Sequence, residues 1–300
     1  MHLFFLALAL QANPVLPAPK QFQASTCQEW GEPKPVSRLA DAELVELSGL
    51  AASHIHPNLL YAHNDSGDVP RFFGMMDDGK PFGRYYLEGA KAVDWEDIAV
   101  GPCTEGSCIF LGDIGDNRLE RSDYVVYSVR EPDDPWTGDH RLLQFNRYPF
   151  QYPKKEKHNA ETLLVHPLTG VIYVITKEFK GTPSTVYRFP MPLEADHVAT
   201  LEKVATLSVP GPNDLMLTGG DIDPTGLRLI LRMYNRAVVL EAEHTRDFEE
   251  IFKATPKEVP TADEPQGEAI AWGPDSHSYF TSSEKKGKET PFLYKVECVK

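Results

Sequence analysis

A short acidic segment that returns five times along the chain is the feature that most constrains the fold. Residues 94–99 read DWEDIA, and four other segments align with them. These segments are ELSGLA (46–51), NAETLL (159–164), TGGDID (218–223) and QGEAIA (266–271). Every copy has Leu or Ile at its fifth position, and the spacings between copies are 48, 65, 59 and 48 residues. Such internal repetition predicts one supersecondary unit for each copy.

The runs that follow each copy have the composition of β-strands. After a turn such as HPLTG comes a run rich in β-branched and aromatic residues, such as VIYVITKE (171–178). A third run of this kind follows, and then a more polar fourth run, with candidates at 83–89, 141–150, 203–209 and 248–254. Four antiparallel strands repeated around an axis form the blade of a β-propeller. The chain is therefore predicted to be all-β, a single propeller of four-stranded blades, with five blades preferred.

The fifth unit has only three runs before the C-terminus, so its outer strand must come from elsewhere in the chain. The stretch KPVSRLA (34–40) belongs to no unit and precedes the first copy. We expect this stretch to supply the missing strand, so that an N-terminal strand closes the ring. The propeller domain is therefore predicted to span residues 34–300.

Other folds compete with this prediction. The two long spacings could hide a sixth blade, although EPDDPWTGDH (131–140) and YPKKEKH (152–158) account for the first excess as loops. A β-sandwich is the second alternative, but it does not predict one motif recurring five times. The stretch DAELVELSGLAA (41–52) also fits a local helix through Leu44, Leu47 and Leu50.

The N-terminus has the pattern of a secretory signal peptide. Residues 3–10 form an apolar run that is too short to span a bilayer, and small residues suited to cleavage follow at Ala12 and Ala18. We expect residues 1–18 to be a signal peptide and residues 19–33 an N-terminal extension, in a secreted or periplasmic protein. The segment lacks Lys and Arg before its apolar run, so a buried first strand is the alternative. No later segment is long and apolar enough to be transmembrane.

Four cysteines bear on the same question. Cys103 and Cys108 flank a short polar turn, which fits a hairpin disulfide, and Cys27 and Cys298 lie near opposite ends of the chain. Pairing of the latter two would hold the ends together. Four cysteines allow three pairings, and the sequence alone does not exclude the other two. Disulfides fit an exported protein, whereas four reduced thiols would indicate a cytosolic one.

The net charge of the chain limits its partners. The formal charge is -14, and nucleic-acid binding needs clustered Lys and Arg, so no nucleic-acid partner is expected. An acidic chain fits better with metal cations or basic ligands. The sequence does not specify an oligomer, and we expect a monomer.

The third residue of each copy is expected to face the central channel. In a propeller the first strand of each blade lines the channel, which would bring Glu96, Glu161 and Glu268 together, with Ser48 and Gly220 completing the circle. Carboxylates that face one another either have raised pKa values or share a cation. A hard divalent ion with oxygen ligands suits such a site, and Ca²⁺ is the preferred cofactor, with Asp113 as a further metal ligand. Zinc fits poorly, because only the HIH at 54–56 offers closely spaced ligands, in a turn.

Polar side chains near the ends of the second strands could supply catalysis. We select His63, Asp65, Lys177 and Arg232 as candidate catalytic residues, because polar groups are costly inside a sheet unless they are paired. Each has a structural alternative. Asp65, like Asp68, Asp116 and Asn117, could only make a turn. Lys177 and Arg232 could form structural ion pairs, and His63 could be a core histidine. No Gly-x-Ser-x-Gly elbow, P-loop or HExxH motif is present.

The segments ELSGLA…HNDSGD, DWEDIA…GDIGDN, NAETLLV and QGEAIA resemble a group of exported bacterial propeller proteins of uncharacterised function. The resemblance covers about residues 36–300. More loosely, the chain is similar to calcium-containing propellers, namely phytase-like, lactonase-like and apyrase-like hydrolases and NHL-type rings. This resemblance implies acidic calcium ligands at Glu96, Glu161 and Glu268, and substrate contacts for phosphate or an acyl group at Lys177 and Arg232.

Two functions follow as hypotheses. The first is a metal-dependent hydrolase of phosphoesters or lactones, in which a carboxylate or His63 would activate water. The second is a non-catalytic ligand- or protein-binding propeller with a structural ion. In both cases a small-molecule or anionic ligand is expected in the central channel.

Overall fold

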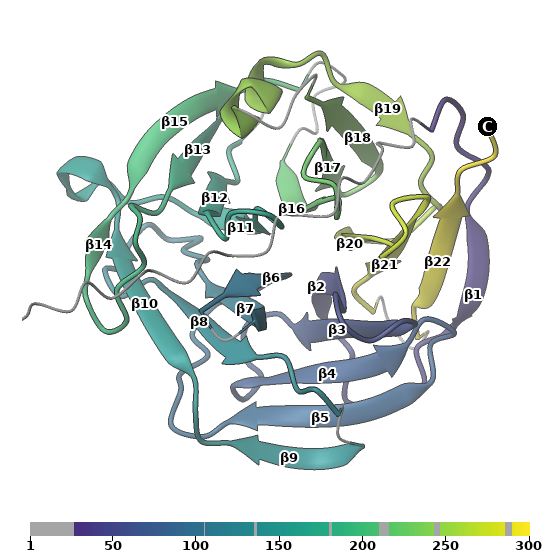
Figure 1. Cartoon of the computed structure of the whole chain (residues 1–300), viewed down its shortest axis with the longest axis horizontal. Helices are drawn as coiled ribbons and strands as arrows, with labels where there is room; N and C mark the ends of the chain where they lie inside the picture. Colours follow the sequence, from purple (N-terminus) through teal and green to yellow (C-terminus); the bar gives the residue numbers. More distant parts are fainter. Residues whose placement is uncertain are drawn as a thin grey trace, which may run out of the picture.

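Five β-sheets are arranged around a central axis in the computed structural model, and we call the region where their first strands meet around this axis the channel (Figure 1). The structure describes residues 27–104, 106–134, 137–179, 182–209, 216–242, 247–285 and 290–300. The predicted signal peptide and most of the predicted extension lie outside the described residues. No helix among the residues described is long and apolar enough to cross a membrane. The predicted five-bladed propeller is confirmed, and the six-bladed ring and the sandwich were wrong alternatives.

The strands follow the radial order expected of blades. The first blade contains β2 (Leu47–Ala52), β3 (Leu59–Asn64), β4 (Arg71–Met76), β5 (Pro81–Leu87) and β9 (Gly138–Leu142). The second contains β6 (Trp95–Cys103), β7 (Gly106–Asp113), β8 (Val125–Arg130), β10 (Asn146–Gln151) and β14 (Ala199–Thr200). The third contains β11 (Ala160–Val165), β12 (Ile172–Thr176), β13 (Ser184–Arg188) and β15 (Glu202–Leu207). The fourth contains β16 (Leu217–Ile222), β17 (Arg228–Met233), β18 (Arg236–Glu241) and β19 (Lys257–Val259). The fifth contains β20 (Gly267–Trp272), β21 (Ser278–Ser283), β22 (Phe292–Glu297) and β1 (Lys34–Arg38).

An N-terminal strand closes the ring, as predicted. Strand β1 pairs antiparallel with β22 at the outer edge of the fifth blade. Next to this closure Trp30 forms a bridge with Cys298 and packs against Trp272 and Tyr279. The disulfides join Cys27 to Cys298 and Cys103 to Cys108. The first disulfide therefore links the two chain segments that complete the same blade.

The excess length in the second and third units forms crossings between neighbouring blades. After β8 the chain leaves the second blade, adds β9 in parallel to β5 of the first blade, and returns as β10. After β13 it likewise adds β14 in parallel to β10 of the second blade and returns as β15. Two blades therefore have five strands each. These crossings explain the long spacings between copies without a sixth blade.

Two of the predicted fourth runs were wrong. The run at 141–150 is divided between the end of β9 in the first blade and β10 in the second, and the run of the fourth blade is not a strand. The predicted outer strand at 248–254 is instead the 3-10 helix η2 (Phe248–Lys253), and β19 is the true outer strand. The side chains of Phe248, Ile251 and Phe252 in η2 are buried against the third blade. Glu249 of the same helix forms an ion pair with Arg188 of that blade. Apolar residues at a spacing of three and four suit one face of a helical turn better than a strand.

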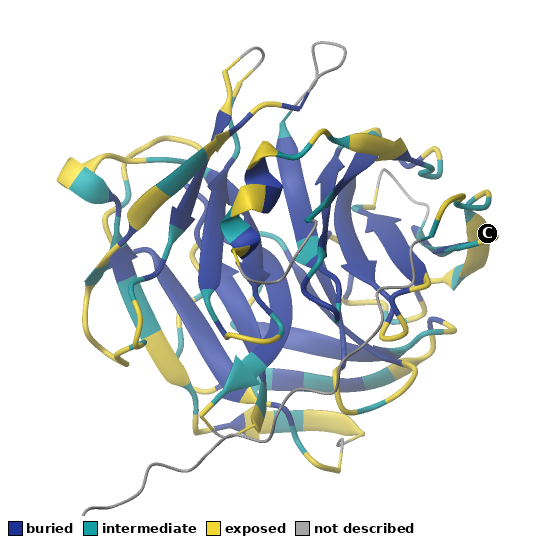
Figure 2. Cartoon of the chain, turned by 45° about the horizontal axis from the view of Figure 1, so that its top comes forward, coloured by how far each residue is buried: buried dark blue, intermediate teal, exposed yellow. Residues whose placement is uncertain are grey.

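The core lies between the blades rather than inside one layer. The inner strands β2, β11 and β20 are buried along their whole length, while the outer strands expose residues along one side (Figure 2). Neighbouring blades cover both faces of each inner strand, so these strands need apolar or small residues throughout. This packing places the starts of the first strands, and the acidic segments before them, around the channel.

The two disulfides should differ in their effect on stability. Replacing Cys27 and Cys298 by Ser is expected to lower the free energy of unfolding by about 5 kcal/mol, since this crosslink closes nearly the whole chain. The matched control is Cys103→Ser with Cys108→Ser. It removes a disulfide between residues only 5 positions apart and should lower the free energy of unfolding by about 2 kcal/mol. Chemical denaturation of both variants measures this. Equal losses would contradict a ring held shut at its ends.

Candidate cation site in the central channel

A β-bulge at the second residue of each first strand sets the geometry of the channel. The pairing of first and second strands skips one residue in every blade. The skipped residues are Ser48, Glu96, Glu161, Thr218 and Glu268. A bulge leaves its residue outside the ladder and re-aims its side chain. The aligned glutamates are therefore equivalent in structure, as the sequence predicted.

The alignment was wrong in the fourth blade by two residues. Thr218, not Gly220, is the bulged residue of β16. Gly220 takes the place that Leu or Ile holds in the other blades, because a Cβ there would lie 2.8 Å from the Ile230 carbonyl oxygen and 2.9 Å from Leu231. Because of the Gly219–Gly220 pair, the sequence alignment placed the third motif position at Gly220 instead of Thr218.

The two hydroxyl residues at the bulges hold neighbouring blades together. Ser48 donates a hydrogen bond to the Glu96 carbonyl (2.7 Å), and Thr218 donates one to the Gly267 carbonyl (3.1 Å). Deeper in the first strands, Asp97 accepts from the Leu163 amide, and burial raises its pKa. Asp221 likewise accepts from the Trp272 amide, and burial raises its pKa to about 8. These four side chains form hydrogen bonds with backbone groups on the first strand of the neighbouring blade, so their role is structural.

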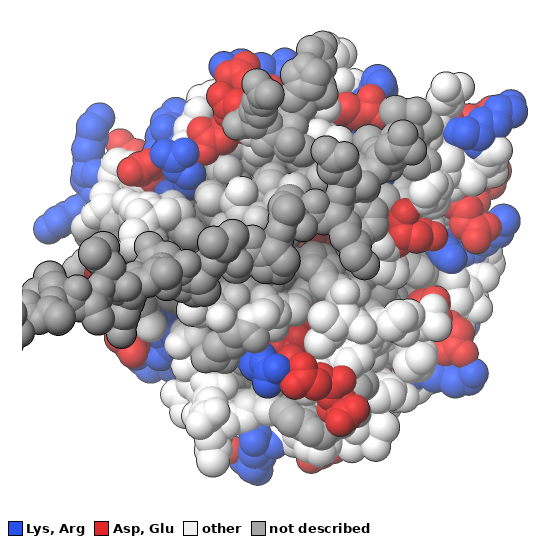
Figure 3. Space-filling model, viewed as in Figure 1, with Lys and Arg blue, Asp and Glu red and all other residues white. Residues whose placement is uncertain are grey.

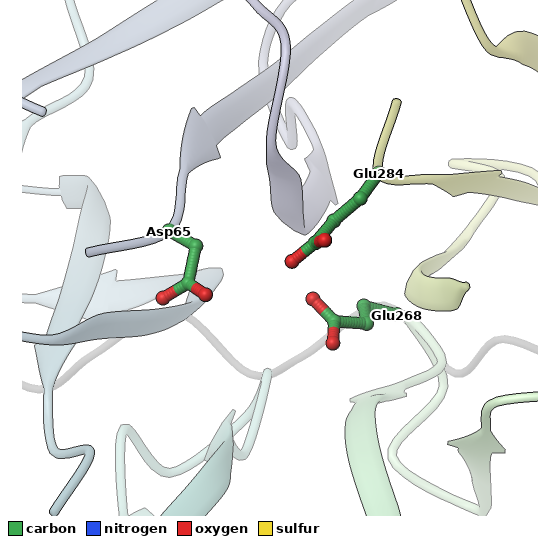
Figure 4. A group of neighbouring side chains, drawn as sticks. All are labelled: Asp65, Glu268 and Glu284. Atoms are coloured by element: carbon green, nitrogen blue, oxygen red, sulfur yellow. The ribbon is translucent and has the colours of Figure 1, made fainter. Parts of the chain in front are cut away.

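Carboxylates gather in two groups where the glutamates meet. Asp65, Glu268 and Glu284 offer oxygens within 4.8 Å of one another, and Asp65, Asp94 and Glu96 do the same. Asp65 belongs to both groups. Figure 4 shows the carboxylates of Asp65, Glu268 and Glu284 pointing toward one another from the first and fifth blades. Since Asp65 and Glu284 each directly follow a second strand, the same turn of two adjacent blades delivers them.

Burial and mutual repulsion raise the pKa values of Asp94, Glu96, Glu268 and Glu284. Burial, and then the charge of Asp65, raises the pKa of Asp94 to about 6. Burial, and then Glu284 and Glu161, raises the pKa of Glu268 to about 9. Burial, followed by the charges of Glu161 and Asp65, raises the pKa of Glu96 well above its usual range. A positive charge placed among them would stabilise their ionised forms.

Glu96 is the least compensated of the group. It is 3% exposed, and its carboxylate has no hydrogen bond or ion pair with any residue that the structure describes. Gly115 makes room for it, because a Cβ at 115 would lie 2.1 Å from Glu96 Oε1 and 2.5 Å from Asp94 Oδ2. The Glu96 carboxylate is therefore buried and unpaired among the described residues, and it lies so close to Gly115 that no side chain would fit at position 115. Such a group fits an external cation.

Lys177 is the cation that the chain itself brings to the channel. It follows β12, and its Nζ lies 2.5 Å from Glu161 Oε2 and donates to the Tyr234 hydroxyl at 2.8 Å. Burial opposes the charge of Lys177, but the Glu161 carboxylate outweighs it and raises the pKa of the ammonium. The predicted ligand Glu161 is therefore already paired, and its partner is the predicted site residue Lys177.

Three predicted site residues lie outside this cluster. Asp113 forms an ion pair with Arg121 (2.7 Å) and accepts from the Asp94 amide (3.0 Å), so it positions Asp94. His63 is buried, with Nδ1 bonded to the Asn64 carbonyl at 2.8 Å and its ring against Trp95. Arg232 is fully buried and pairs with Glu264 at 2.7 Å. In the structure these three residues make structural contacts, and none of them belongs to the two groups of clustered carboxylates.

Two members of the cluster were not among the candidate site residues selected from the sequence. Asp94 is the first residue of the DWEDIA segment, and Glu284 ends the second run of the fifth unit. The signal that could have found Glu284 is its place after a second strand, which matches that of Asp65 and Lys177. Asp116, by contrast, caps a turn through the Glu120 and Arg121 amides, as its structural alternative predicted.

Other partners receive less support from the structure. The two carboxylate groups found among the described residues contain no His or Cys, and His56 contacts the Pro132 carbonyl instead. On the face shown in Figure 3, Lys and Arg side chains alternate with Asp and Glu around the rim. The described residues on this face form no continuous basic surface of the kind that nucleic acid requires.

Comparisons with known proteins agree with the fold. No family model and no curated protein matches the chain. A PQQ-bound aldose sugar dehydrogenase from Streptomyces coelicolor is similar in structure, with a TM-score of 0.50 and 10% identity over 89% of this chain and 98% of that one. The Cps50 (Swd1) propeller domain from Myceliophteria thermophila has a TM-score of 0.41 and 12% identity, over 85% of this chain and 84% of that one. A 6-phosphogluconolactonase-like protein from Bacteroides uniformis has a TM-score of 0.39 and 12% identity, over 87% of this chain and 74% of that one. At such identities the first of these shows a shared fold alone, and this chain is a five-bladed β-propeller.

Proposed function

We propose that this protein is an exported β-propeller whose central channel binds a divalent cation, with Ca²⁺ preferred. The observation that carries the proposal is the convergence of Asp65, Asp94, Glu96, Glu268 and Glu284 in two groups that share Asp65. Carboxylate oxygens are the ligands that Ca²⁺ takes, in flexible geometry. Export is supported by the two disulfides and by the signal-peptide pattern of residues 1–18. The motif resemblance to exported bacterial propellers, and more loosely to calcium-containing ones, points the same way.

The first candidate activity is hydrolysis of a phosphoester or lactone. A cation bound in the channel would polarise the phosphoryl or carbonyl oxygen of such a substrate. A carboxylate of the channel would act as the general base that accepts a proton from the attacking water. Lys177 carries the positive charge beside which an anionic substrate group would be stabilised.

The second candidate is a non-catalytic propeller that binds a ligand or protein, with the ion as a structural plug. It is favoured by the burial of His63 and Arg232 away from the channel, which leaves no histidine among the clustered residues. In this case the cation would stabilise the ring and the channel would only bind its ligand.

Activity assays separate the two candidates. Purified protein is assayed on an aryl phosphate and on a lactone, with Ca²⁺ and with a chelator. For a hydrolase we expect chelator and Glu96→Gln each to lower the rate roughly 10- to 100-fold. Glu258→Gln, an exposed carboxylate on β19, is the control and should be unaffected. No turnover, together with a Tm raised by Ca²⁺, would identify the non-catalytic propeller. The absence of both turnover and a Tm shift would contradict the proposed function.

A further inference from the structure

The carboxylates of the channel outnumber the charge of one divalent ion. Both groups of the cluster contain three carboxylates, and only Asp65 is common to them. Oxygens bound to one Ca²⁺ at 2.3–2.6 Å lie within about 5 Å of one another, so each group by itself has the spacing of one ion's ligands. The two groups together carry five carboxylates, which one divalent cation would leave strongly unbalanced.

Each group also lies against a different wall of the channel. Glu268 and Glu284 come from the fifth blade, whereas Asp94 and Glu96 come from the start of the second. Asp65 follows β3 in the first blade, between these two walls of the ring. A carboxylate has two oxygens, so Asp65 can contribute to both groups at the same time.

The buried Glu96 is an independent sign that its group takes a ligand. Its carboxylate is unpaired among the described residues and is directed toward Asp65 and Asp94, as their close oxygens require. An ionised carboxylate in a protein interior is strongly disfavoured unless it has a partner of opposite charge. Glu268, in contrast, receives a long hydrogen bond from Gln266 (3.4 Å), and Gln266 also bonds to Glu284 (2.7 Å).

A third acidic position in the ring is filled from within. Glu161 occupies the same bulge in the third blade as Glu96 and Glu268 in theirs, and Lys177 occupies the place after the second strand that Asp65 and Glu284 hold. Directly after the second strand, the first and fifth blades have the acids Asp65 and Glu284, whereas the third blade has Lys177. The Lys177 ammonium neutralises the charge of Glu161.

We propose that the channel binds two divalent cations that share Asp65 as a bridging ligand, and that Lys177 takes the place of a third by pairing with Glu161. One cation lies among Asp65, Asp94 and Glu96, and the other among Asp65, Glu268 and Glu284. This inference rests on the proposed function, since it assigns the number and the ligands of the cations. The five ligands then face two divalent charges, and the Glu161–Lys177 pair adds none.

Native mass spectrometry and calorimetric titration with Ca²⁺ test this proposal without any substrate. We expect two ions for the wild type, one for Glu96→Gln, one for Glu284→Gln, and loss of both high-affinity sites for Asp65→Asn. The Glu96 and Glu284 variants should fold, because each removes one of several carboxylates that repel one another. Glu258→Gln, remote on β19, is the matched control and should bind two ions.

Lys177→Gln provides a second, opposite test. It frees Glu161 and should increase the number of bound ions or tighten Ca²⁺ binding at least tenfold. One ion in the wild type, or equal stoichiometry in the Glu96 and Glu284 variants and the wild type, would overturn the two-ion centre while leaving the proposed function intact. No bound ion in the wild type would instead overturn the proposed function itself.

Discussion

In the presence of a chelator, the free energy of unfolding is expected to fall as the pH rises from about 6.5 to about 9. Glu161 has a pKa of about 7 and Glu268 a pKa of about 9, both raised mainly by burial. A carboxyl group with a raised pKa binds more protons when folded than when unfolded, so raising the pH through this window favours unfolding. By this linkage Glu268 alone contributes about 3 kcal/mol.

The window begins near pH 6.5 because a histidine acts in the opposite direction below it. Burial lowers the pKa of His166 to about 4, so its contribution to stability grows as the pH rises from 4 toward 6.5. Above 6.5 the slope is governed by the carboxyl groups of the channel together with the buried Asp221, whose pKa of about 8 acts in the same direction.

Calcium should remove this loss of stability. Bound cations hold the carboxylates in their ionised form, and a ligand at a hundredfold excess over its Kd adds about 2.7 kcal/mol per site. Thermal and denaturant unfolding at pH 6.5, 7.5 and 9, with chelator and with Ca²⁺, measure the two slopes. Glu268→Gln should flatten the chelator curve, and Glu258→Gln should not. A stability that rises with pH in chelator would contradict the electrostatics of the channel.

Arg232→Met should destabilise the fold by about 3–5 kcal/mol while leaving Ca²⁺ binding unchanged. Arg232 and Glu264 form a fully desolvated pair, with side chains 0% and 2% exposed. Removing the guanidinium leaves the Glu264 carboxylate without its partner inside the interface of the fourth and fifth blades. Because this pair lies outside the carboxylate cluster, the cation site should survive.

A double-mutant cycle tests the pair directly. Arg232→Met combined with Glu264→Gln should cost less than the sum of the single variants, because the second change removes the stranded charge. Chemical denaturation gives the free energies, and calorimetric titration gives the Ca²⁺ affinity. Additive losses would contradict the pairing of Arg232 with Glu264. A weakened Ca²⁺ affinity at unchanged stability would show that Arg232 serves the channel.

Most of the architecture could be predicted from the sequence, because the repeated segment marks where every blade begins. Glu96, Glu161 and Glu268 were placed correctly by this repeat, and so was the closing strand before it. The fourth blade was harder, since two glycines allowed the motif to be matched two residues away from Thr218. The crossings that form β9 and β14 have no local signal, because their partners lie in neighbouring blades.

The membership of the site depended on contacts that a sequence does not contain. His63 and Arg232 lie within the second strands, and their side chains pack between blades, against Trp95 and Glu264 respectively. Asp113 differs from Asp65 in that Arg121, eight residues onward, pairs with it. Lys177 was found by position, whereas its pairing with Glu161 follows only from the packed ring.

The most direct test of the central claim is a crystal structure of the protein grown with Mn²⁺, which takes oxygen ligands as Ca²⁺ does and scatters anomalously. The account predicts anomalous peaks in the channel within bonding distance of Asp65, with Glu96 on one side and Glu284 on the other. A well-ordered channel that contains no anomalous peak at saturating Mn²⁺ would contradict it.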